Sequence, residues 1–235
     1  MPVRDESLQE HDHAIDRSPD GKCSRAYTIG YWSSLAATVC GIVYLLILAG
    51  ALIFGQFTYP PSETVQTLAG VITLIVCPII VVMMASLHTV TAAEKKALSL
   101  SSLAFTVLFA MAVSINRFTQ LGVLRQRAGL GIAEGIEWFL PYGSHSIMLG
   151  LEIMGWGWFL GLALLIAASI FSGGALQAWL RWSMVLYGVL GLISAIAFLM
   201  ASPLSAIGFI AWGPILFIIT GLLAIHFRQA GDRLL

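Results

Sequence analysis

Side chains able to bind or transform a small molecule gather in one part of an otherwise apolar chain. An arginine can hold a carboxylate or phosphate through two parallel hydrogen bonds, and a carboxylate can hold an amine or a cation. A pocket lined by both suits a small zwitterion or a lipid headgroup. The residues predicted to line it are Asn116, Arg117, Gln120, His145, Glu152 and Trp156.

Four more charged residues fall between the two apolar stretches that hold this set, and they are predicted to surround the pocket mouth. They are Arg125, Arg127, Glu134 and Glu137. The alternative is purely structural: Arg117 and Glu152 form an ion pair that fixes two helices, while Arg125 and Arg127 extend to lipid phosphates. Both hypotheses stay open on the sequence.

Arg117 and Glu152 are expected to meet under either hypothesis. At about 1.5 Å per helical residue, their depths in the membrane differ by about one turn. An unpaired charge costs about 2.5–3.5 kcal/mol near the bilayer centre and less toward its edge. The prediction is a direct pair, or a link through Asn116 or Gln120.

An enzyme is the rival interpretation, with His145 as a base and Glu152 as the group that orients it. Glu137, His145 and Glu152 are also three acceptable metal ligands. The chain has no His-Glu-x-x-His motif, however, and Ser144 and Ser146 flank His145 without facing it on a helix. Neither a catalytic residue nor a metal site is therefore assigned.

Cofactors and nucleic acid are not expected as partners. Cys23, Cys40 and Cys77 form no Cys-x-x-Cys pair, and no lysine lies inside an apolar stretch where it could carry a Schiff base. A formal net charge of zero without a basic block argues against nucleic-acid binding. Membrane lipids, a small amphiphile, a second copy or a membrane subunit remain as partners.

The elements that must position the site are six transmembrane helices. The 235 residues are 58% hydrophobic and 10% charged, with a mean hydropathy of +0.89. A helix needs about 20 mostly apolar residues to cross about 30 Å of hydrocarbon. The predicted spans are 33–55, 66–89, 99–121, 147–171, 179–201 and 205–227. The fold class is thus an all-α membrane bundle.

The ends of the chain are predicted to be cytoplasmic. Residues 1–32 are polar and are predicted to be a disordered tail, 33–228 the membrane domain, and 229–235 a short second tail. With both ends inside, nine of the twelve Lys and Arg residues are cytoplasmic. Short loops and the lack of a targeting segment suit a bacterial inner membrane.

Two further features concern the helices themselves. The stretch 99–121 is the least apolar and is expected to face the bundle interior, and residues 132–140 show amphipathic spacing that predicts a short helix on the outer surface. Pro78 and Pro214 are expected to bend their spans. Gly157 and Gly161 are spaced for close helix packing.

Three short motifs carry a resemblance. Asn116-Arg117-Phe118, Pro141-Tyr142-Gly143-Ser144 and Gly155-Trp156-Gly157-Trp158-Phe159 resemble segments of small six-helix prokaryotic membrane proteins to which no activity is assigned. The resemblance covers about the third to sixth spans. It implies one compact six-helix bundle and no particular reaction.

The leading function is therefore non-catalytic: binding, sensing or moving a small amphiphile or lipid through an outward-facing pocket between the third and fourth spans. The alternatives are an intramembrane enzyme using His145 and Glu152, and a structural or accessory subunit without a ligand.

Overall fold

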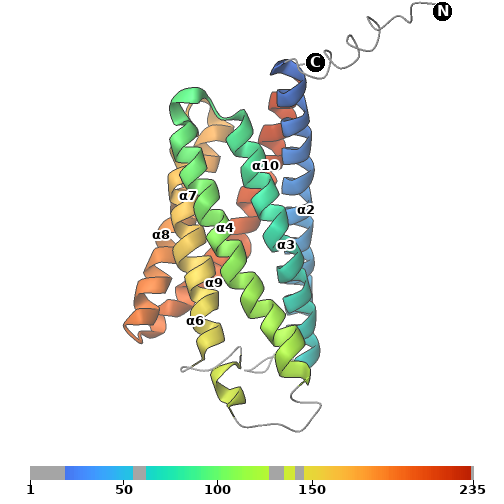
Figure 1. Ribbon diagram of the computed structural model, residues 1–235, viewed down its shortest axis with the longest axis vertical. Helices are drawn as coiled ribbons and strands as arrows, with labels where there is room; N and C mark the ends of the chain where they lie inside the picture. The colour runs from blue at the N-terminus through green and yellow to red at the C-terminus, as the bar shows by residue number, and fades with distance from the viewer. Residues whose placement is uncertain (1–18, 55–61, 127–134, 141–145, 234–235) are drawn as a thin grey trace, which may run out of the picture.

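The computed structural model describes residues 19–54, 62–126, 135–140 and 146–233, which form helices and turns without a strand (Figure 1). Six helical segments are long and apolar enough to cross a membrane. They are Ser24–Ile53, Glu63–Val90, Ala93–Leu124, Ile147–Ala168, Ala175–Leu199 and Pro203–Gly231. Each coincides with one predicted span, so the six-helix prediction is confirmed.

The spans are built from elements of different helical type. The first three spans contain α2 (Pro19–Ile53), α3 (Glu63–Val90), η1 (Ala93–Lys95), α4 (Lys96–Phe118) and η2 (Thr119–Leu124). The fourth and fifth contain α6 (Ile147–Ile153), η4 (Met154–Phe159), α7 (Leu160–Ala168) and α8 (Ala175–Leu199). The sixth contains η5 (Pro203–Ile207), α9 (Gly208–Ile210), η6 (Ala211–Ile215) and α10 (Leu216–Gly231).

The first helix begins earlier than residue 33, where the predicted tail ends. α2 already starts at Pro19. Tyr27 packs edge-on against Phe227 of α10, with ring centroids 6.4 Å apart. This contact outside the apolar stretch extends the helix, and a hydropathy boundary does not detect it. The predicted disordered tail is therefore too long at its carboxyl end.

The exterior of the bundle is apolar, as lipid contact requires. Large side chains such as Leu46, Phe118 and Leu199 are 65%, 69% and 80% exposed. A soluble monomer rarely exposes contiguous apolar surface on this scale. The six long apolar helices are those of an integral membrane protein.

The polar third span faces inward along much of its length, as expected. Ser102 and Thr106 of α4 are fully buried, and Asn116 near its end is 1% exposed. The Ser102 hydroxyl donates to the carbonyl of Ala163 in α7 over 2.7 Å. Such a bond between helices satisfies polar groups that water cannot reach.

Glycines bring the fourth span close to α8. A Cβ atom added to Gly157 would lie 2.8 Å from the carbonyl oxygen of Gly191, and one added to Gly191 would lie 2.9 Å from that of Gly157. The two backbones therefore touch, as the spacing of Gly157 and Gly161 predicts. This contact holds the fourth span against α8, and the same span also packs on α4.

The sixth span is bent in its middle. Gly213 has φ −86° and ψ −105°, which is not helical, and Pro214 follows it within the π-helical segment η6. Below the bend α9 and η6 pack on α8, whereas above it α10 packs on α2 (Figure 1). The predicted bend at Pro214 is thus present, and it separates the first half of the sixth span from α2.

The predicted outer helix lies mostly outside the described residues. Of that segment the structure shows a single turn of 3₁₀ helix, Ile136–Trp138, with the preceding Gly135 at φ 73°. The amphipathic surface helix remains a prediction. At the far end of the bundle the first turns of α2 lie beside the end of α10, where Gly231 is next to Tyr27 (Figure 1).

Candidate functional site

Arg117 and Glu152 meet between the third and fourth spans. An Nη2 nitrogen of Arg117 bonds a carboxylate oxygen of Glu152. The two side chains are 12% and 14% exposed, so the ion pair is largely shielded from its surroundings. The predicted direct pairing is confirmed.

Two amides extend the pair into a closed ring of hydrogen bonds. Asn116 Nδ2 donates to the second oxygen of Glu152. Arg117 Nη1 donates to Gln120 Oε1 over 3.0 Å, and Gln120 Nε2 donates to Asn116 Oδ1 over 2.5 Å. The spacings of three and four residues put these side chains on one face of the third span.

Trp156 completes the cluster from the fourth span. Its Nε1 donates to Glu152 Oε1 over 3.0 Å, one helical turn away. The indole also packs edge-on against Phe109 at 4.6 Å between ring centroids. The Tyr187 hydroxyl donates to the Trp156 carbonyl over 3.1 Å. We call Asn116, Arg117, Gln120, Glu152 and Trp156 the polar network.

The charges of the polar network balance. Glu152 accepts from Arg117, Asn116 and Trp156, and Arg117 also contacts Gln120. The guanidinium of Arg117 compensates the negative charge of the carboxylate beside it. The arrangement is hydrogen-bonded and electrically neutral in sum.

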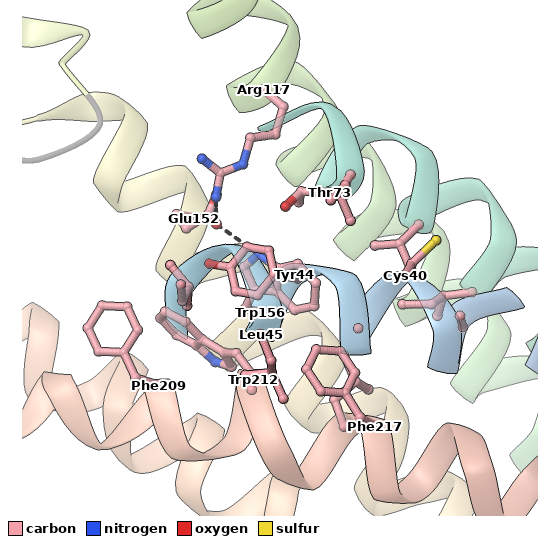
Figure 2. A pocket seen from close by; sticks show the side chains of 18 of the residues that line it. Cys40, Tyr44, Leu45, Thr73, Arg117, Glu152, Trp156, Phe209, Trp212 and Phe217 are labelled. Carbon is pink, nitrogen blue, oxygen red and sulfur yellow. Dashed lines mark hydrogen bonds and ion pairs between the residues drawn. The ribbon is translucent and has the colours of Figure 1, made fainter. Parts of the chain in front are cut away.

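A cavity of about 230 Å³ adjoins the polar network. Figure 2 shows Arg117 and Glu152 at one end and Phe209, Trp212 and Phe217 along another wall. The polar network supplies one end, and the other walls come from α2, α3 and the sixth span. Their lining residues are Ala37, Cys40, Gly41, Tyr44, Leu45, Leu48, Ile72, Thr73, Val76, Ile80, Leu149, Phe209, Trp212, Gly213, Pro214, Leu216, Phe217 and Thr220.

Most of these walls escaped the sequence reasoning, which placed the pocket between the third and fourth spans alone. Tyr44 of α2 and Trp212 of η6 are among these lining residues, and the indole nitrogen of Trp212 is itself buried. Their sequence signal was slight: each is a polar aromatic residue in the middle of an apolar stretch rather than at its end. Aromatic residues with polar groups more often mark the membrane interface.

The cavity reaches the outer surface of the bundle beside α2. Leu45 and Phe209 both line it, and they are 39% and 65% exposed. They come from α2 and α9, the two elements that the bend at Pro214 holds apart. The opening therefore faces the side of the bundle, where lipid would lie.

The predicted pocket mouth is only partly described. Arg125 is exposed directly after η2. Arg127, Glu134 and His145 lie outside the described residues, and so does the side chain of Glu137. The predicted roles of these residues stay predictions.

Metal ligands do not gather in the described part of the chain, where no three His, Cys, Asp or Glu side chains are grouped. Of the three ligands considered above, only the side chain of Glu152 is described, and its oxygens bond Arg117, Asn116 and Trp156. The comparison with known proteins adds no further assignment: no known protein family, curated protein or solved structure matches the chain.

Proposed function

We propose that the protein binds a small amphiphile or lipid in the cavity beside the polar network, as a sensor or carrier in a bacterial inner membrane. The observation that carries this proposal is the shape and chemistry of the cavity, which is polar at one end and apolar along most of its walls. A ligand with a polar head and an apolar chain matches both parts.

The distribution of lysine and arginine supports an orientation for this site. With both termini cytoplasmic, the polar network lies toward the outer side of the membrane. The ligand would then come from the outer leaflet. Arg125, exposed after η2, is positioned near the headgroups on that side.

Binding is favoured over catalysis by the state of Glu152. Three donors occupy its carboxylate, and two of them, Arg117 and Asn116, are themselves held by Gln120. A general base must offer a free oxygen to its substrate, and these donors already occupy both carboxylate oxygens of Glu152. The polar network is therefore better suited to hold a headgroup.

Native mass spectrometry of the purified full chain tests the proposal. The wild type is expected to retain an amphiphile, and Val76→Phe is expected to lose most of it because the larger ring fills the cavity that Val76 lines. The matched control is Ile75→Phe, at a position 50% exposed on the same helix and outside the cavity lining.

The fold of Val76→Phe is checked through its thermal unfolding midpoint. Equal retention of the amphiphile by Val76→Phe and Ile75→Phe, with both variants folded, would place the bound molecule elsewhere and overturn the proposal. An accessory subunit without a ligand would show no retained amphiphile in any of the three proteins.

A further inference from the structure

We infer that the ligand is an uncharged lipid whose headgroup accepts hydrogen bonds, and that its chain leaves the cavity sideways between α2 and α9. This inference rests on the proposed function and names the class of molecule that the site takes. Three independent features support it: the charge balance, the unused hydroxyl of Tyr44 and the lateral opening.

The charge balance excludes a strongly charged headgroup. Within the cavity lining, Arg117 and Glu152 are the charged side chains, and they bond each other. An anionic headgroup would have to draw Arg117 away and leave Glu152 as a buried, uncompensated charge. A cationic headgroup would do the reverse. Breaking a shielded pair is far costlier than leaving it intact.

An unused donor indicates what the headgroup provides. Tyr44 lines the cavity, and its hydroxyl makes no hydrogen bond within the described part of the chain. A donor without an acceptor in an apolar cavity is unfavourable. A carbonyl oxygen brought into the cavity would accept from this hydroxyl.

The lateral opening gives the chain of the lipid its path. A cavity of about 230 Å³ holds a ring or a headgroup, since a cavity of about 150 Å³ holds benzene. A long hydrocarbon chain must therefore extend outside. The exposed Leu45 and Phe209 line the cavity where α9 diverges from α2, so the chain can pass between them into the bilayer.

Two sources of lipid share this chemistry, and a binding experiment separates them. The probes are dioctanoylglycerol, with ester carbonyls, a decyl-substituted benzoquinone, with ring carbonyls, and dioctanoyl phosphatidate, an anion with the same acyl chains as the first. Dissociation constants are measured for the full chain in a neutral detergent. At least one uncharged probe is expected to bind about tenfold or more tighter than phosphatidate.

Removal of this donor should weaken that binding. Tyr44→Phe deletes the hydroxyl and keeps the aromatic ring, so it is expected to raise the dissociation constant about fivefold. The matched control is Tyr31→Phe, which makes the same change on the same helix outside the cavity lining. It should leave the dissociation constant unchanged.

The path of the chain is tested by narrowing the opening. Leu45→Trp is expected to slow association of the uncharged probe severalfold, because Leu45 lines the opening. Leu46→Trp, one residue further along α2 on the lipid-facing surface, is the control and should not slow it.

Several results would overturn the inference. Tighter binding of phosphatidate, or equal effects of Tyr44→Phe and Tyr31→Phe, would exclude an uncharged headgroup at the Tyr44 hydroxyl. Equal association rates for Leu45→Trp and Leu46→Trp would exclude the lateral path. In each case an amphiphile lost in Val76→Phe would still support the proposed function, so the two failures are distinguishable.

Discussion

The carboxylate of Glu152 joins the third and fourth spans by accepting hydrogen bonds from three donors. Arg117 and Asn116 come from the third span, whereas Trp156 comes from the same span as Glu152. Each donor compensates for water that the carboxylate lacks. The contribution of any one partner therefore depends on whether the others remain.

Neutralising one member of the ion pair should be far more harmful than neutralising both. Glu152→Gln leaves the charge of Arg117, which is 12% exposed, without its carboxylate, and Arg117→Gln leaves that of Glu152, which is 14% exposed, without its guanidinium. Each change is expected to cost about 3 kcal/mol of unfolding free energy. The double variant should come within about 1 kcal/mol of the wild type. The unfolding free energies of the wild type, the two single variants and the double variant are measured in mixed detergent micelles.

Arg125→Gln is the control for this cycle, because Arg125 is an exposed arginine shortly after the polar network. It should change the unfolding free energy by less than about 0.5 kcal/mol. If the double variant loses as much as the two single variants together, the pair is not the source of their effect.

At this scale the sequence predicted one contact well and missed others. The pairing of Arg117 with Glu152 followed from depth and from the cost of a lone charge in lipid. Tyr44 and Trp212 could not be placed in the same way, because they carry no charge and their stretches are apolar on every face. Only the packing of the first and sixth spans brings them to the cavity.

Among the helices, the fourth span depends on its contact with α8. The 2.8 Å approach that a Cβ atom of residue 157 would make is to a backbone oxygen, which cannot rotate away as a side chain can. The helices must then separate along their length. Because Glu152 and Trp156 are on the same span, separation at Gly157 also disturbs the polar network.

Gly157→Ala is accordingly expected to destabilise the protein by about 1–3 kcal/mol, measured as the loss of unfolding free energy in mixed micelles. Gly150→Ala is the matched control in the same span, where the nearest contact of an added Cβ atom is 3.9 Å away. That change should be neutral or stabilising, since alanine favours a helix by up to about 1 kcal/mol over glycine. Equal losses for the two variants would refute the packing argument.

The bends show how far sequence reasoning reaches at the level of elements. Proline removes a backbone donor, so Pro214 predicts a bend but not the direction of that bend. The π-helical segments η2 and η4 contain no proline and gave no signal. Their extra residue per turn is imposed by the neighbours of each helix, and these follow from the packing of the whole chain.

For the whole molecule, the spans were predictable because length and hydropathy are local properties. The arrangement of the spans was not, because apolar helices in lipid pack through shape rather than through hydrophobicity. The pocket illustrates the difference: its polar end was predicted from the charges on two spans, while its walls depend on α2, α3 and the sixth span coming together.

The membrane topology gives a prediction for the intact chain. Six spans return the chain to its starting side, and the first turns of α2 lie beside the end of α10. From the bias in lysine and arginine we propose that this side is cytoplasmic. A fluorescent protein fused to either terminus should fluoresce in bacterial cells, and alkaline phosphatase fused there should be inactive.

Reporter fusions in the connection between the first and second spans are the control and should give the opposite pattern. Active phosphatase at both termini would show the inverse topology, with the polar network in the cytoplasmic half of the membrane. Opposite results at the two termini would contradict the six-span arrangement itself.

The π-helical segment η4 divides the fourth span into two α-helices, α6 and α7, whose faces are rotated about the helix axis relative to each other. An α-helix turns about 100° per residue, and the wider turn accommodates one additional residue, so α7 is rotated relative to α6 by about that angle. Glu152 in α6 can thus point to the third span, while Gly161 in α7 faces α8. This rotation allows the fourth span to present different faces to the third span and to α8.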